Sequence, residues 1–302
     1  MRDHSAGVLP LRPLTTGEVL DAAVVLLRAQ PRRLVVIGLI IALVEQAILF
    51  PLRRLADVDS SFLPDTGRLG LWGALVVVGV ATEALAIGVL GGLAARQAPR
   101  ALLGPSAPSP AQRTGALAVA LAGVALLCAA SASAFLLVLV PLQVAGIALG
   151  LMITVILWVP TYGLLGLVAP AVVIDGLGPA RALRRSVWLA ARNGMRAALI
   201  RVLGYASWLL VRVALTVAAT TLIELVYVSP SATVDNIIQA VCWLVVNAMA
   251  YPMLGCLDVA LHLDVRMRTE GLDIALRRSL HRGVDTAAVL AVPKGPGQRQ
   301  PA

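Results

Sequence analysis

Three ionisable residues stand inside long apolar stretches, where charged groups are rare. Glu45 lies in the first stretch, Glu83 near the middle of the second and Arg212 near the middle of the fifth. A charge at the centre of a bilayer costs about 2.5–3.5 kcal/mol on insertion scales, so such residues face the bundle interior and pair. With a helical rise of about 1.5 Å per residue, their depths fall within several Å of one another. The pattern predicts a shared cluster of one Arg and two Glu, with one carboxyl group protonated.

Such a cluster has two main interpretations. Glu45, Glu83 and Arg212 either form a proton- or ion-coupled pathway, or they form a buried pair that fixes helix packing. A contact with a partner membrane protein is a third. The packing interpretation is favoured for two reasons. There is a single Arg, and the sequence has no interrupted helices at corresponding positions of two halves, as transporter binding sites have. Arg201 and Asp258 lie nearer the cytoplasmic side and are candidates for a second pair.

Motifs for catalysis are missing from the sequence. The single lysine, Lys294, does not end a Gly-rich phosphate loop, and no HExxH or GxSxG pattern occurs. We therefore predict no catalytic, metal-binding or cofactor-binding residue and no enzyme activity. The three cysteines are expected as free buried thiols, because they lie in apolar runs without metal-ligand spacing: Cys128, Cys242 and Cys256.

The elements that must position these residues are membrane helices. The 302 residues are 59% hydrophobic and 14% charged, whereas soluble domains carry about 25% charged residues. Mean hydropathy is +0.88. Apolar runs long enough to cross a bilayer recur, so the sequence predicts an all-α polytopic bundle of about six transmembrane helices. The expected spans are about 34–52, 70–95, 116–140, 142–174, 197–227 and 237–263.

The fourth span is too long for a simple helix. Its surplus indicates a tilted helix, or a kinked or partly re-entrant piece around "VPTYGLLGLVAP" (159–170). Irregular backbone at membrane depth must face protein or water.

The net charge of +9 is best explained by membrane topology. When six spans start from an inside N-terminus, 20 of the 25 basic residues fall in inside segments. Arg53, Arg54 and Arg68 fall in outside segments, and Arg201 and Arg212 lie within the fifth span. The positive-inside bias then predicts cytoplasmic termini in the cell inner (plasma) membrane, and the placement of the basic residues gives no reason to expect a nucleic-acid partner. The expected organisation is a cytoplasmic segment 1–33, a six-span domain 34–263, and a charged helix with a disordered tail over 264–302.

Two amphipathic helices are expected on the cytoplasmic face, at about 15–30 and 178–196. Thr15 and Glu18 have the spacing of a capping box, and the first helix should end before Pro31. We expect this helix to lie on lipid or on the bundle; the alternative is an extension of the first span. In the second helix, basic residues form a candidate contact with anionic lipid, the alternative being an ordinary positive-inside loop: Arg181, Arg184, Arg185 and Arg192.

Small residues at four-residue intervals predict close helix approach. They are Ala84, Gly88 and Gly92 in the second span, and Gly146 and Gly150 in the fourth. Packing within one chain is the expected use, and a homo-oligomer is the alternative. After the sixth span, Gly271 is expected to interrupt the charged helix.

Three blocks resemble a bacterial family of integral membrane proteins labelled as similar to the membrane domain of glycerophosphoryl diester phosphodiesterase. These blocks are "LRPLTTGEVLDAAVVLLR", "APAVVIDGLGPARALRRSVWLA" and "DVRMRTEGLDIALRR", in that order across nearly the whole chain. The resemblance implies a multi-pass architecture and transfers no catalytic residues. At the end of the first helix the chain departs from the family's pattern, with "LLRAQPRR".

The sequence thus favours a non-enzymatic structural or accessory subunit of a cell-envelope-related membrane assembly. Its partners would be anionic lipid of the cytoplasmic leaflet and another membrane protein. The main alternative is a small secondary transporter or channel that uses Glu45, Glu83 and Arg212. A membrane enzyme or a lipid-handling partner of one is a weaker third.

Overall fold

The chain folds as an all-α bundle, seen in a computed structural model. It describes residues 7–56, 66–142, 146–226, 232–282 and 286–291, apart from 106, 108–109, 111–112 and 194, and it does not describe the side chains of 135–155. No strand occurs in these ranges. In chain order the helices are α1 (Thr16–Ala29), α2 (Pro31–Ala56), the 3₁₀ turn η1 (Thr66–Arg68), α3 (Leu69–Ala95), α4 (Ala98–Leu103), α5 (Thr114–Leu142), α6 (Gly146–Leu165), α7 (Val168–Val173), α8 (Pro179–Arg192), α9 (Arg196–Val226), α10 (Ala232–Glu270), α11 (Leu272–Arg282) and α12 (Thr286–Leu290).

Six helical stretches are long and apolar enough to cross a membrane, which confirms the predicted fold class. They coincide with α2, α3, α5, the α6–α7 region, α9 and α10. Large apolar side chains are exposed along the outer faces of α2 and α9, among them Ile40, Leu43, Leu210 and Leu222. Because hydrocarbon is the solvent such faces require, the chain is a multi-pass membrane protein.

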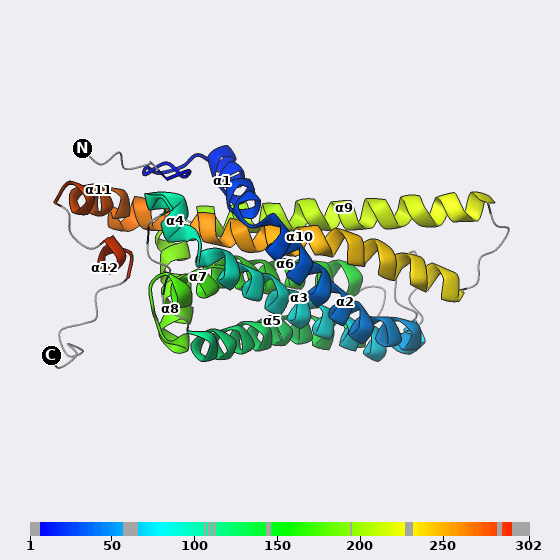
Figure 1. The fold of residues 1–302 in the computed structure, drawn as a ribbon. Coiled ribbons are helices and arrows are strands. Elements are labelled where there is room, and N and C mark those ends of the chain that lie inside the picture. Colours follow the sequence, from blue (N-terminus) through cyan, green and yellow to red (C-terminus); the bar gives the residue numbers. More distant parts are fainter. Residues whose placement is uncertain are drawn as a thin grey trace.

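Helices α8, α11 and α12 gather at one end of the bundle, with α1 and α4 close by (Figure 1). We call this the terminal end. At the opposite end α2 stops at Ala56, α9 stops at Val226 and α10 begins at Ala232.

Helix α10 is the central element and packs against α1, α2, α3 and α9. Its residues Leu254, Leu257 and Leu261 are buried in the main apolar core. Helix α10 ends at Glu270, and Gly271 interrupts the charged helix as predicted, because it takes a left-handed conformation (φ 63°) between α10 and α11.

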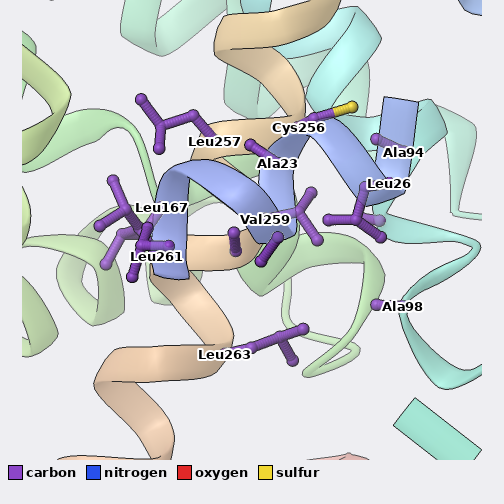
Figure 2. Packing of buried hydrophobic residues seen from close by; sticks show 14 of the residues in the cluster. Ala23, Leu26, Ala94, Ala98, Leu167, Cys256, Leu257, Val259, Leu261 and Leu263 are labelled. Atoms are coloured by element: carbon purple, nitrogen blue, oxygen red, sulfur yellow. The ribbon is translucent and has the colours of Figure 1, made fainter. Parts of the chain in front are cut away.

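The first helix lies on the bundle. Thr15 and Glu18 form the predicted capping box, and α1 ends at Ala29, before Pro31 opens α2. Ala23 and Leu26 of α1 sit among Cys256, Val259 and other core residues of α10 (Figure 2). Gln30, with φ −145° and ψ 53°, separates the two helices, so α1 is not an extension of the first span.

The fourth span is broken within the predicted stretch, but not at its first proline. Pro160 lies inside α6, and the helix stops at Leu165. Gly166 and Leu167 form a turn, after which the short α7 begins at Val168.

Two of the predicted small residues do permit close approach within the chain. A methyl group at Gly88 would overlap Leu121 of α5, and one at Gly92 would lie 2.7 Å from Leu117. Helix α3 also meets α10 through Gly91 and Gly255: a Cβ at Gly255 would lie 2.6 Å from the backbone nitrogen of Gly91. Gly146 and Gly150 lie in α6, where the structure does not describe side-chain surroundings.

Candidate functional site

The predicted intramembrane charges meet in the interior of the bundle. Arg212 of α9 contacts Glu83 of α3, with 2.5 Å between Nη2 and Oε1, and their side chains are only 1% and 10% exposed. Tyr205, two turns earlier on α9, donates a hydrogen bond of 2.6 Å to Glu83 Oε2. The Arg212 guanidinium also lies 5.5–5.7 Å from the ring centres of Tyr205, Trp243 and Tyr251. The pair is therefore enclosed by aromatic side chains.

Glu45 joins this cluster through neutral groups. Its carboxylate accepts hydrogen bonds from Tyr251 (2.6 Å), Asn247 (3.1 Å) and Thr82 (3.1 Å). Tyr251 and Asn247 stand four residues apart on α10, and Thr82 precedes Glu83 on α3. The link between Glu45 and Arg212 is the Tyr251 side chain, whose hydroxyl binds the carboxylate and whose ring faces the guanidinium.

The structure differs in one respect from the predicted cluster, in which one Arg and two Glu share their charges. Arg212 contacts Glu83, whereas Glu45 is held by two hydroxyl groups and an amide. The tyrosine and asparagine that create this separate carboxylate site are uncharged, so the pattern of intramembrane charges did not indicate them.

A second buried pair stabilises the break in the fourth span. Arg201 Nε lies 2.6 Å from Asp258 Oδ1 on α10, and Nη1 of the same guanidinium donates to the carbonyl oxygen of Tyr162 in α6. A methyl group at Gly166 would overlap this guanidinium. The glycine therefore makes room for Arg201 at the point where α6 ends.

Ser186 of α8 completes this arrangement. Its hydroxyl donates to the carbonyl oxygen of Leu164 at 2.5 Å and accepts from the backbone N–H of Leu167 at 3.2 Å. Backbone groups that lose helical partners inside a membrane must find others, since water is absent. Ser186 and Arg201 supply them.

A larger ionic network lies at the terminal end. Asp175, which follows α7, contacts His262 (2.9 Å), Arg266 (2.9 Å) and Arg185 (3.1 Å). Burial acts to raise the pKa of Asp175, but the interactions with His262, Arg266 and Arg185 outweigh it and lower this pKa to about 2. Glu270 binds Arg185 and Arg266 from the other side.

Asp264 fixes the segment before α1. Its carboxylate accepts from the backbone N–H of Leu14 at 2.7 Å and contacts Arg196 at 2.6 Å. Arg196 and Arg268 both donate to the carbonyl oxygen of Leu14. Both peptide groups of this residue are thus held by side chains from α9 and α10.

These polar groups follow one face of α10. Asp258, His262, Arg266 and Glu270 recur every fourth residue. Toward the opposite end Trp243, Asn247 and Tyr251 are also four residues apart, and Tyr251 lies seven residues, about two turns, before Asp258. Residues four apart share a helical face. This periodicity is visible in the sequence, and it is the signal that sequence analysis missed. The end of the segment was predicted to be a charged helix that leaves the membrane, whereas its polar residues form a buried stripe.

The predicted lipid-contact residues divide into two groups. Arg181, Arg184 and Arg192 are exposed on α8, and Arg192 lies 5.0 Å from the Trp188 ring centre. Arg185 is partly buried in its ion pairs with Asp175 and Glu270. The exposed face therefore offers three of the four arginines.

Groups that suit other chemistry are sparse in the part of the chain that the structure describes. No set of three or more His, Cys, Asp or Glu side chains there is placed to hold a metal ion. Cys128, Cys242 and Cys256 are free and buried, as predicted.

No protein family, curated protein or solved structure matches the chain. The geometry of its charges is therefore the basis for inferring its function.

Proposed function

We propose that this protein is a non-enzymatic structural or accessory subunit of an envelope-related membrane assembly, and that its intramembrane charges hold its helices together. The observation that carries the proposal is the close Glu83–Arg212 contact, closed in by Tyr205 and Tyr251. A transport carboxylate must exchange its proton or ion during each cycle. Both carboxylate oxygens of Glu83 are already engaged, Oε1 in the contact with Arg212 and Oε2 in the hydrogen bond from Tyr205, which leaves neither free for a transported proton or ion.

Helix α9 shows why such contacts are needed. Its outer face is apolar, and Arg201, Tyr205, Arg212 and Thr216 are among the few residues it buries. Lipid offers no hydrophobic driving force between helices, so packing and polar contacts must hold them together. Two arginines therefore join α9 to α3 and α10.

We further propose that the terminal end faces the cytoplasm and that the membrane is the bacterial plasma membrane. The excess of arginine in the segments at this end supports that orientation. Arg181, Arg184 and Arg192 would then contact anionic headgroups, each worth about 1 kcal/mol near the surface. The resemblance of the three sequence blocks to a family of multi-pass integral membrane proteins is consistent with the architecture that this proposal assumes.

Site-specific photo-crosslinking in native membranes tests the subunit role. A crosslinker at Leu210 or Leu222 of α9 probes one lipid-facing surface, and one at Leu126 of α5 probes another; all three residues are exposed. A subunit is expected to give a discrete protein adduct from one surface and not the other. Lipid adducts alone from every position contradict the proposal.

Transport by the same residues is the second candidate function. It is favoured by the polar stripe of α10 and by Glu45, whose three hydrogen bonds come from neutral groups. Proton flux into proteoliposomes separates the two candidates. Packing predicts equal flux with wild-type protein, Glu83→Gln and Glu45→Gln; flux in the wild type that either variant abolishes without unfolding overturns the scaffold.

A further inference from the structure

The opposite end of the bundle holds a buried cation that forms no salt bridge among the described residues; the carboxylate of Glu45 acts on it without direct contact. Arg53, in the last turn of α2, is 5% exposed. Its Nη2 donates to Gln46 Oε1 at 3.2 Å, and its guanidinium lies 5.8 Å from the ring centre of Trp243. Its Nη1 is buried and finds no acceptor in the described part of the chain. An unpaired buried charge is costly, so Arg53 calls for a counter-charge.

Two buried amides close to Arg53 also lack partners there. Gln46 Nε2 is without an acceptor, and Gln239 of α10 has neither an acceptor for Nε2 nor a donor for Oε1. Gln46 is 5% exposed and Gln239 1%. A buried amide without hydrogen-bond partners destabilises the folded protein, and a bound ligand can supply those partners.

The contacts between α2 and α10 bring these groups to one region. The helices run antiparallel and are joined by Arg54 and Thr233 (3.4 Å) near the opposite end and by Glu45 and Asn247 (3.1 Å) deeper in the bundle. Gln239 lies between those two points on α10, and Gln46 and Arg53 lie between them on α2. Gln46 already touches Arg53, and Trp243, one turn from Gln239, faces the same guanidinium.

We propose that Arg53, Gln46 and Gln239 form a binding site for an oxyanion, specifically a phosphate group. A guanidinium and amide N–H groups are donors suited to phosphate oxygens. Arg53 lies in the last turn of α2 and Gln46 two turns earlier, so a phosphate group would reach the site from this end of the bundle. The phosphate therefore comes either from a lipid headgroup or from free phosphate. This site is separate from the Glu83–Arg212 contact and does not depend on the proposed function.

Thermal unfolding of delipidated protein tests for free phosphate. Potassium phosphate, titrated against potassium chloride of equal ionic strength, is expected to raise the Tm of wild-type protein with the logarithm of its concentration. Arg53→Gln is expected to weaken binding about tenfold or more, and Gln239→Leu to weaken it as well. Arg54→Gln is the matched control, because Arg54 is exposed and adjacent, and its Tm shift should equal that of the wild type.

Native mass spectrometry of protein released from membranes tests for the lipid. A phospholipid adduct on the wild type and Arg54→Gln that Arg53→Gln and Gln239→Leu lack identifies the headgroup as the source. Folding of every variant is checked by circular dichroism and gel filtration. The proposal is overturned when wild-type protein shows neither a phosphate-dependent Tm shift nor a lipid adduct, a result which indicates that water alone satisfies these donors. It is also overturned when Gln239→Leu and Arg53→Gln bind phosphate or phospholipid as tightly as Arg54→Gln does.

Discussion

Arg201 of α9 lies 2.6 Å from Asp258 of α10 while its guanidinium also donates to the carbonyl oxygen of Tyr162 at the end of α6. One side chain thus joins three helices and satisfies a backbone group at a break inside the membrane. The arrangement links an ionic contact to the shape of the fourth span, because the break requires both the guanidinium and the space left by Gly166.

Neutralising one member of this pair should destabilise the protein strongly. Asp258→Asn leaves Arg201 buried without its counter-charge, and breaking such a pair costs about 3–5 kcal/mol. Unfolding in mixed micelles with increasing SDS measures the loss. Arg192→Gln, a change to an exposed arginine of α8, is the control and should unfold like the wild type. Equal stability of Asp258→Asn and wild type would show that the pair contributes nothing.

The hydroxyl of Ser186 should matter for the same break. Ser186→Ala removes the bonds to Leu164 and Leu167 and leaves two backbone groups unpaired, at an expected cost of about 1–3 kcal/mol. Ser207→Ala is matched to it, since the hydroxyl of Ser207 bonds only within its own helix and is exposed. The same unfolding assay compares the two; a loss as large in Ser207→Ala would contradict a specific role for Ser186.

The contact of α3 with α10 should not tolerate a methyl group. In Gly255→Ala the new Cβ lies 2.6 Å from the backbone of Gly91, which has no flexible side chain to move aside. We expect a loss of about 1–3 kcal/mol from overpacking. Gly79→Ala, on the same α3, places its Cβ 3.9 Å from Leu49 and should be neutral or slightly stabilising. Thermal unfolding in detergent distinguishes the two variants, and the prediction fails when both behave alike.

Acid should weaken the terminal end through Asp175. The pKa of this residue is lowered from 3.8 to about 2 in the folded protein. A lowered pKa means that the folded state binds the proton less readily than the unfolded state. The stabilisation is therefore fully present above about pH 4 and is lost as pH falls toward 2. Melting temperatures of wild type and Asp175→Asn between about pH 5 and pH 2 measure the effect: the variant should be less stable at the upper end of this range, and the difference should shrink on acidification. A constant difference would argue against this linkage.

Sequence periodicity and charge predict much of the fold and part of the site. Apolar run length defined the six spans, and the spacing of Thr15 and Glu18 defined the start of α1, because both depend on local rules. Glu45, Glu83 and Arg212 stood out since charges are costly in lipid. Asp175 did not, because its burial depends on how α7 meets α10, which no local pattern encodes, whereas His262 shares the four-residue spacing of Asp258 and Arg266, which is visible in the sequence. The surplus length of the fourth span predicted a break within 159–170, but not its position at Gly166, because that position depends on Arg201, which lies 35 residues further along the chain.

The carboxylate of Asp264 holds the peptide groups around Leu14, which lies 250 residues earlier in the chain. Ribosomes deliver the N-terminal segment first, yet its acceptor is delivered within the last helix to enter the membrane. Leu9 of this segment finds its acceptor early, because its N–H donates to the carbonyl oxygen of Ala101 in α4, but Leu14 has to wait until α10 is inserted. A truncated or stalled chain that lacks α10 would leave the peptide groups of Leu14 without these partners, so the docking of Leu14 marks a finished molecule.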